Sequence, residues 1–208
     1  MTTETARVEA FSDGVFAIAI TLLILEIKIP SPGPTQLSLQ LLRQWPSYVS
    51  FVISFAFIGI MWINHHRLFT HIKRSDDALL ILNLLLLLGV TAVPFPTAVL
   101  AAHLRQPGQR TAVLLYNGTY VFIAICFNIL WRYAASKEHR LLAHDVDDQA
   151  IDHITRQYAF GPFFYLICFA LAYVSVAASL ILNGALACFF ALPPHLVKRK
   201  RQSQTSTA

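Results

Sequence analysis

The chain has 208 residues, of which 56% are hydrophobic and only 13% are charged, and its mean hydropathy is +0.56. A soluble domain carries about 25% charged residues, so this composition excludes an ordinary soluble enzyme. Each of six apolar runs is long enough to cross a hydrocarbon core of about 30 Å. We therefore predict an all-α integral membrane protein, and we assign the net charge of +5 to a lipid surface rather than to nucleic acid.

The first three predicted helices span residues 8–29, 46–66 and 77–101. The first ends at the prolines and glycine of residues 30–34, because proline cannot continue a helix. It lacks a small-residue cleavage site, so we interpret it as a retained helix rather than a signal peptide. The third contains two prolines in its far half, which predict a kink that a membrane helix tolerates when its neighbours satisfy the freed backbone groups.

The second half of the chain begins with a fourth predicted helix over residues 111–133. The polar segment at 136–157 has room for a short surface helix. The apolar stretch at 158–192 is too long for one ordinary span. We therefore divide it into a fifth and a sixth helix, with a tight turn near residues 173–178.

Charge distribution predicts the orientation of these six spans. With both termini on the same side, that side collects 12 Lys and Arg residues and the other side only 4. The positive-inside rule then places both termini in the cytoplasm, and we expect the protein in the plasma or inner membrane. A six-helix transmembrane domain is predicted over residues 1–195, and the basic tail at 196–208 is predicted to be disordered.

The first helix presents a narrow aliphatic stripe that contains one hydroxyl group. At 100° per residue, the stripe covers about 100° of the helix surface. Its members are Gly14, Ile18, Thr21, Leu22 and Leu25. Most such faces in membrane helices pack against protein or lipid, so the stripe alone is weak support for a functional role.

Asp13 lies on a different face, at the same predicted depth as a polar cluster that ends the second helix. A partly buried carboxylate needs donors, and Trp62, Asn64 and His65 supply them. We predict that Asp13 is hydrogen-bonded by Trp62 and by Asn64 or a nearby histidine, which would lock the first helix against the second. Two alternatives stay open: a direct role in ion coordination or proton relay, and a solvated carboxylate at a helix end.

Other polar residues inside the predicted helices are assigned structural roles. Asn83 and Asn128 are single amides, for which interhelical hydrogen bonding is the default. Asn117 opens a glycosylation pattern, but it lies inside a predicted helix and is discarded as an acceptor. The spacing of histidines, cysteines and carboxylates predicts no metal site. The sequence also lacks a TVGYG-type potassium filter and a nucleotide-binding loop.

Two motifs resemble a known family. The segment from Arg7 to Asp13 has the form R-x-x-x-F-S-D, and Trp62-x-Asn64-His65 ends the second helix. With the six-helix layout, these motifs make the sequence similar to the lysosomal transmembrane potassium channel family, and within it to the single-repeat prokaryotic members. The resemblance implies a homotetramer in the bilayer in which the first helix of each subunit lines a central pore.

The resemblance also implies roles for individual residues. It places the narrowest pore ring at Ile18, a hydroxyl layer at Thr21 and further aliphatic rings at Leu22 and Leu25. It implies a supporting polar network with these members: Arg7, Phe11, Ser12, Asp13, Trp62, Asn64 and His65.

The implied function is a potassium-selective leak channel that needs no cofactor and conducts K+. A proton-coupled secondary transporter that uses Asp13 and Glu26 is the main alternative, and a non-conducting scaffold is the third. Transporters carry ionisable groups near the bilayer midplane, whereas both of these carboxylates lie near helix ends. This position disfavours the transporter.

Overall fold

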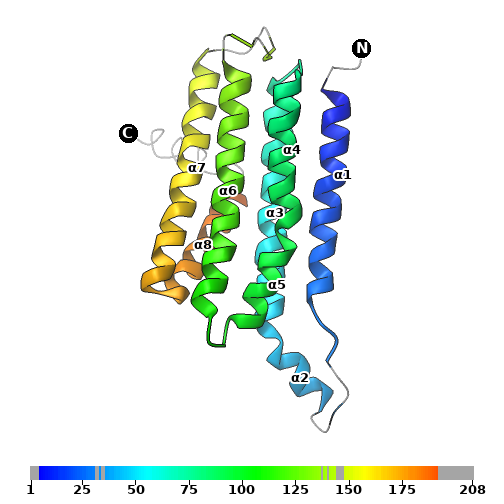
Figure 1. Ribbon diagram of the computed structural model, residues 1–208, viewed down its shortest axis with the longest axis vertical. Coiled ribbons are helices and arrows are strands. Elements are labelled where there is room, and N and C mark those ends of the chain that lie inside the picture. Colours follow the sequence, from blue (N-terminus) through cyan, green and yellow to red (C-terminus); the bar gives the residue numbers. More distant parts are fainter. Residues whose placement is uncertain are drawn as a thin grey trace, which may run out of the picture.

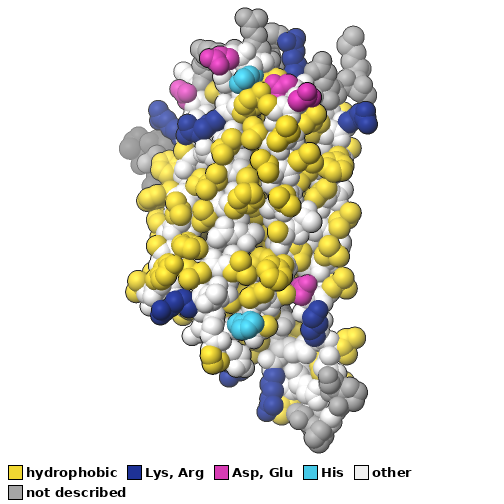
Figure 2. Space-filling model, in the orientation of Figure 1, with side chains coloured by type: hydrophobic (Ala, Val, Ile, Leu, Met, Phe, Trp, Pro, Cys, Tyr) yellow, Lys and Arg dark blue, Asp and Glu magenta, His cyan; other side chains and the backbone are white. Residues whose placement is uncertain are grey.

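A computed structural model describes residues 5–30, 33, 36–136, 138–139, 141–143 and 148–191. This part of the chain is helical apart from turns and one isolated antiparallel bridge between Ile72 and Leu142. The long helices run side by side along the long axis of the molecule, and α1 lies at one edge of the bundle (Figure 1). The predicted all-α membrane fold is confirmed. Hydrophobic side chains form a broad band over the face in view, with charged side chains above and below it (Figure 2).

The helices follow in the chain order α1 (Ala6–Leu22), the 3-10 turn η1 (Leu23–Glu26), α2 (Leu37–Arg43), α3 (Trp45–His71), α4 (Asp77–Ala92), α5 (Pro94–His103), α6 (Gln109–Ala135), α7 (Asp148–Val174) and α8 (Val176–Ala191). Five segments of the described chain are long and apolar enough to cross a membrane: Ala6–Glu26, Trp45–His71, Asp77–His103, Gln109–Ala135 and Ile154–Val174. The sixth predicted span coincides with the shorter apolar helix α8.

Three boundaries show how the sequence determines the elements. The third span breaks at Val93, between α4 and α5, because Pro94 and Pro96 lack the N–H groups that would continue the α-helical pattern. The predicted turn in the last apolar stretch falls at Ser175, between α7 and α8. The short surface helix expected between residues 136 and 157 is wrong for the described residues, because the helix that starts at Asp148 continues directly into the membrane segment as α7.

The core lies where α3, α4 and α6 meet, and α7 and α8 cover its far side. Its largest fully buried side chains include Trp131, Tyr116, Tyr120, Phe57 and Phe69. One polar cluster joins α3, α5 and α6 beside the break. The hydroxyl of Ser54 lies 2.8 Å from Thr97 Oγ1 and 3.0 Å from the Tyr116 hydroxyl.

The predicted channel domain and disordered tail remain predictions, and residues 192–208 lie outside the described part of the chain. The described residues do show that the polar segment after α6 packs onto the connection between α3 and α4. Lys73 N–H donates to the Leu141 carbonyl at 2.9 Å, and Ala143 N–H donates to the His71 carbonyl at 2.9 Å. This connection holds the start of α4 in place, which matters because α4 carries one of the contacts that position α1.

Candidate functional site

The aliphatic stripe of α1 is left uncovered by the rest of the chain. Gly14 and Thr21 are exposed, and the exposed fractions are 60% for Ile18, 38% for Leu22 and 63% for Leu25. All five residues of the predicted stripe therefore lie on one open face at the edge of the bundle, continuing into η1.

The opposite face of α1 holds the helix to the bundle. Ser12, Phe16, Ala19 and Leu23 are buried, and their spacing of four, three and four residues marks one side of a helix. This side packs against α3 and α4. Since one side is committed to the bundle, the rotation of α1 about its axis is determined, and the stripe must point away from its own subunit.

Thr21 is the one polar side chain of the stripe. Its hydroxyl donates to the Ile18 carbonyl at 2.9 Å. A hydroxyl group has one proton and two acceptor lone pairs. Because the proton is used within the helix, the lone pairs are left on the open face, where an oxygen atom is a suitable partner for a cation.

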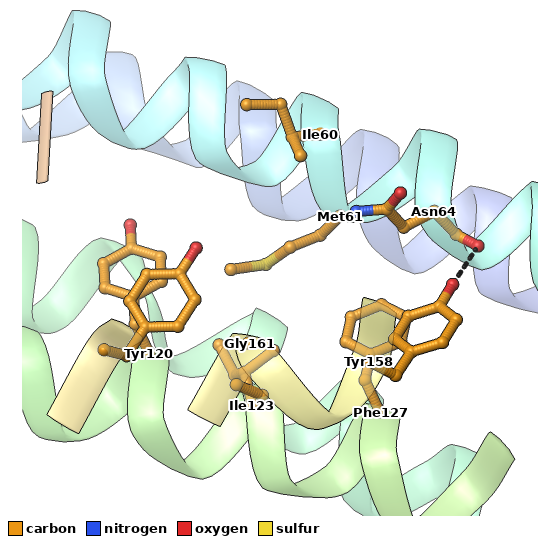
Figure 3. A pocket seen from close by; sticks show the side chains of 10 residues that line it. Ile60, Met61, Asn64, Tyr120, Ile123, Phe127, Tyr158 and Gly161 are labelled. Carbon is orange, nitrogen blue, oxygen red and sulfur yellow. Dashed lines mark hydrogen bonds between the residues drawn. The ribbon is translucent and has the colours of Figure 1, made fainter. Parts of the chain in front are cut away.

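Asp13 is held by the indole of Trp62, as predicted. Trp62 Nε1–H donates to Asp13 Oδ1 at 2.8 Å. The expected second donor is not found among the described contacts. Asn64 instead lines a cavity of about 70 Å³ between α3, α6 and α7. Its backbone carbonyl accepts a hydrogen bond of 3.2 Å from the Tyr158 hydroxyl (Figure 3). The ring of His66 stacks on Trp62 with a centroid distance of 6.5 Å.

A buried chain of hydrogen bonds fixes α1 more deeply. Asn83 Nδ2 donates to Ser12 Oγ at 3.0 Å, and Ser12 Oγ donates to the Val8 carbonyl at 2.8 Å. His65 Nε2 lies 2.9 Å from Asn83 Oδ1. Because the Asn83 amide nitrogen already faces Ser12, its oxygen is the acceptor, which makes His65 Nε2–H the donor.

This chain links α1, α3 and α4, and its three side chains are at most 2% exposed. The sequence supplied all three residues but did not pair them. Asn83 is the residue from which this link could have been found, because its predicted interhelical hydrogen bond is confirmed. The matching prediction for Asn128 is wrong: its Oδ1 accepts from Arg132 Nε at 2.7 Å within α6.

Arg7 and Phe11 complete the predicted network but lie outside this buried chain. Arg7 is exposed and Phe11 is 57% exposed, on the open side of α1. Their supporting role is not tested within one subunit.

The sequence also missed the role of Asn117, which was considered only as a glycosylation pattern. Its Nδ2 donates to the Cys168 carbonyl and to Ser179 Oγ, both at 2.9 Å. Its Oδ1 accepts from Asn183 Nδ2 at 2.9 Å. Asn117 therefore joins α6, α7 and α8 inside the bundle, away from α1.

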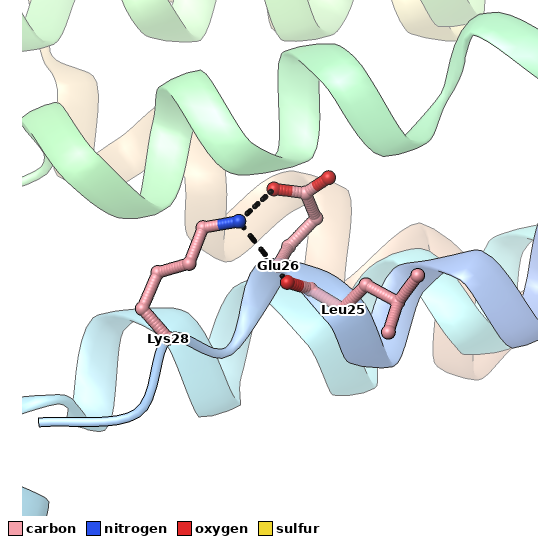
Figure 4. Close-up of polar contacts among 3 residues, drawn as sticks. All are labelled: Leu25, Glu26 and Lys28. Atoms are coloured by element: carbon pink, nitrogen blue, oxygen red, sulfur yellow. Dashed lines mark hydrogen bonds and ion pairs between the residues drawn. The ribbon is translucent and has the colours of Figure 1, made fainter.

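Glu26 lies at the other end of the first helix from Asp13. Lys28 Nζ lies 3.7 Å from Glu26 Oε2 and donates to the Leu25 carbonyl at 3.1 Å (Figure 4). Glu26 follows Asp13 by 13 positions, which correspond to about 20 Å of helix, and the interval is almost entirely apolar. A direct proton relay between Asp13 and Glu26 along α1 has no intermediate groups. Within the described residues, no group of three or more His, Cys, Asp or Glu side chains could hold a metal ion.

Comparison with known proteins gives the family. A family model described as the endosomal/lysosomal potassium channel TMEM175 matches residues 7–94, from the second residue of α1 to just beyond the end of α4. A potassium channel from Chamaesiphon minutus is 52% identical over 192 residues, which cover 91% of this chain and 94% of that protein. The chain belongs to the TMEM175 family.

Two further relatives match over similar lengths of the chain. A potassium channel from Streptomyces collinus is 46% identical over 189 residues, covering 90% of this chain and 91% of that one. The human endosomal/lysosomal proton channel TMEM175 is 32% identical over 202 residues, which are 89% of this chain but 40% of the human protein.

Solved structures agree with this assignment. The crystal structure of a lysosomal potassium-selective channel TMEM175 homolog from Chamaesiphon minutus has a TM-score of 0.82 and 50% identity, and the match covers 90% of this chain and 96% of that one. The family resemblance inferred from R-x-x-x-F-S-D is confirmed, and the protein is a multi-pass membrane protein that resides in a lipid bilayer.

Proposed function

We propose that this TMEM175-family protein is a potassium-selective leak channel of the plasma or inner membrane, with both termini in the cytoplasm. Four copies of the chain would surround one pore, and α1 of each copy would line it. Two relatives that match nearly the whole chain are potassium channels, and the structural neighbour of 50% identity is described as potassium-selective. Permeant K+ is then the ligand, and no cofactor is required.

One observation supports the position of the pore above the others. The stripe of α1 combines exposed aliphatic side chains, a single hydroxyl and a fixed rotation toward the outside of the subunit. An open face of this kind would suit lipid equally well, but it lies within the segment matched by the family model, residues 7–94. The alternative, a helix face that only contacts lipid, gives no role to the hydroxyl lone pairs of Thr21.

The physical mechanism follows from four copies of this stripe around an axis. A ring of Ile18 side chains is a poor environment for a cation and gates by dewetting. Conduction requires a wider, wetted state in which partly hydrated ions pass. Thr21 lies about one turn beyond Ile18, and its free lone pairs would replace part of the lost hydration. Leu22 and Leu25 add further aliphatic rings.

Preference for K+ over Na+ follows in direction from the same constriction. A ring too narrow for a fully hydrated ion favours the ion that sheds water more easily. This arrangement dispenses with rings of backbone carbonyls, the device of filter-type potassium channels. Oxygen atoms in the path come instead from Thr21.

The polar contacts that connect α1 to α3 and α4 would keep the four Ile18 side chains aligned around the axis. Trp62 holds Asp13, and the Ser12, Asn83 and His65 chain holds the buried side. A rotation of α1 by a few tens of degrees would replace Ile18 at the axis by a neighbouring side chain, so small errors in this support would change conduction. Arg7 and Phe11, at the same end of α1, are assigned to contacts between subunits.

Potassium flux into liposomes tests the proposal. The variant Ile18→Asn replaces an apolar ring by amides and should raise flux by wetting the constriction. Ile125→Asn is the matched control, because Ile125 is 41% exposed near the middle of α6 and carries the same chemical change to a lipid-facing position. We expect wild-type flux above that of empty vesicles, a changed flux for Ile18→Asn and a wild-type flux for Ile125→Asn.

Two results would contradict the proposal in different ways. Absence of potassium flux from a well-folded oligomer would reject the leak channel. Equal effects of the two asparagine variants would retain a channel but remove α1 from its lining. Proton flux should be recorded in the same vesicles, because the human relative is named a proton channel.

A further inference from the structure

A groove of about 430 Å³ runs between α4 and α6 on the outer surface of the bundle. The two helices are neighbours on the face seen in Figure 1. The small residues of its lining are Gly89, Ala92 and Gly118. The exposed apolar side chains that border it are Leu88, Leu115 and Phe122. No part of the mechanism proposed above uses this groove.

The lining offers no free hydrogen-bond donor to a polar ligand. Among the described residues that form it, Thr119 is the only one with a polar side chain, and its hydroxyl already donates to the Leu115 carbonyl at 3.0 Å. Both bordering helices are membrane spans, so the surrounding solvent is the acyl region of the bilayer. The occupant must therefore be apolar along the length of the groove.

The groove occupies one leaflet. Helices α4 and α6 run in opposite directions, with Gly89 against Ile123. Phe122 lies at the middle of the 27-residue helix α6 and marks the inner end of the groove. Leu114 lies eight residues nearer the start of α6, a distance of about 12 Å along the helix axis. Half of a hydrocarbon core is about 15 Å, so the groove matches the depth of one leaflet.

A basic side chain stands at the headgroup end. Arg110 lies four residues before Leu114, on the adjoining turn of the same helix row, and is exposed. Basic side chains also gather at the lower end of the face seen in Figure 2, below the apolar band. A guanidinium group matches a phosphate with paired hydrogen bonds.

We propose that this groove binds one phospholipid, with an acyl chain along α4 and α6 and the phosphate at Arg110. A second copy of the chain fits less well. A helix with its side chains is about 10–12 Å across, which is wider than a groove of this volume spread over one leaflet. The bound lipid would fill a gap that the helices leave open and would brace α4, the helix that carries Asn83.

Photolabelling of the intact protein tests the site. The probe is phosphatidylglycerol with a diazirine in its acyl chain, reconstituted with the full-length protein and mapped by peptide mass spectrometry. We expect labels to concentrate on peptides that contain residues 88–92 and 114–122. Ala92→Leu fills the groove from α4 and should reduce this labelling to the level of the general lipid-facing surface. Ala78→Leu, which adds the same side chain at an exposed position of the same helix, should leave it unchanged.

Loss of the phosphate partner gives an independent result. Arg110→Gln should lower labelling of the groove about fivefold, whereas Arg105→Gln in the preceding loop should not lower it. If Ala92→Leu does not yield folded protein, Thr119→Leu fills the same groove from α6. Labels spread evenly over all exposed helices would overturn the proposal. Crosslinks from the groove to a second copy of the chain would overturn it as well.

Discussion

The two sides of the subunit are held together by different means. On one side, α6 packs against α7 through buried aromatic rings such as Trp131 and Tyr120, and Asn117 ties both to α8. On the other side, only one narrow face of α1 is buried, and a few directed hydrogen bonds from α3 and α4 hold the helix. Bundle packing thus stabilises the fold on the first side, whereas polar contacts set the rotation of α1 on the second. This separation suits a channel in which one helix must be positioned precisely within a stable frame.

Two of the three tryptophans provide the sharpest test of this difference. Trp131 is fully buried and donates to Thr155 at 2.9 Å, whereas Trp62 is 44% exposed and donates to Asp13 at 2.8 Å. Trp131→Ala should cost about 3–5 kcal/mol of the free energy of unfolding, because it leaves a cavity in a packed interior. Trp62→Ala should cost less than half of that free energy of unfolding. It should nevertheless change the potassium flux per folded channel more than Trp131→Ala does. Unfolding in detergent and flux in liposomes measure the two effects, and the same ratio of losses for both variants would remove the distinction.

Two glycines should respond with opposite signs. A Cβ on Gly89 would lie 2.7 Å from Ile123 Cγ1, whereas a Cβ on Gly59 meets nothing within 4 Å. Gly89→Ala should destabilise the protein by about 1–3 kcal/mol through overpacking between α4 and α6. Gly59→Ala should stabilise it by about 0.5–1 kcal/mol, because alanine restricts the unfolded backbone more than glycine does. Thermal unfolding midpoints in one detergent provide the measurement, and a stabilised Gly89→Ala would show that α4 and α6 are less closely packed than described.

The sequence predicted more about faces than about partners. Helical spacing grouped the aliphatic stripe on one face of α1, which the subunit leaves open, and the prolines predicted the break that falls at Val93. Both follow from local rules that act within one helix. The pairing of His65 with Asn83, or of Asn117 with Ser179 and Asn183, depends on the rotation and height of separate helices. A single sequence does not encode these two quantities in any local pattern, so the prediction that Asn64 or a nearby histidine bonds Asp13 rests on similar depth alone.

Asn83 is the position where a change should affect α1 without disturbing the rest of the bundle. Asn83→Ala leaves Ser12 without its donor and His65 without its acceptor. Polar contacts between membrane helices contribute about 0.6–2 kcal/mol each, so we expect a loss of about 1–3 kcal/mol together with altered potassium flux. Asn128→Ala removes only a contact within α6 and serves as the control with wild-type flux. Unaltered flux in well-folded Asn83→Ala would separate the buried chain from the positioning of α1.

The smallest expected effect concerns the helix that joins the two sides. Asp76 caps α4 by accepting from Leu79 N–H, and it also accepts from the Tyr133 hydroxyl of α6, both at 2.8 Å. Partial burial alone would raise the pKa of this carboxyl, but these two hydrogen bonds and the nearby His139 outweigh burial and hold the pKa below its usual value of 3.8.

A carboxyl with a depressed pKa in the folded state contributes stability that is fully present above its unfolded pKa and is lost as the pH falls through its folded pKa. The contribution of Asp76 should therefore be constant at neutral pH and should decline only below about pH 4. Asp76→Asn keeps a capping oxygen and should lose this acid-dependent part while changing neutral-pH stability by less than about 1 kcal/mol. Unfolding midpoints recorded between pH 3 and pH 7 distinguish the variants. Parallel acid profiles for the wild type and Asp76→Asn would show that the contact between Asp76 and Tyr133 adds no stability, and that packing rather than a directed contact like those that hold α1 couples α4 to α6.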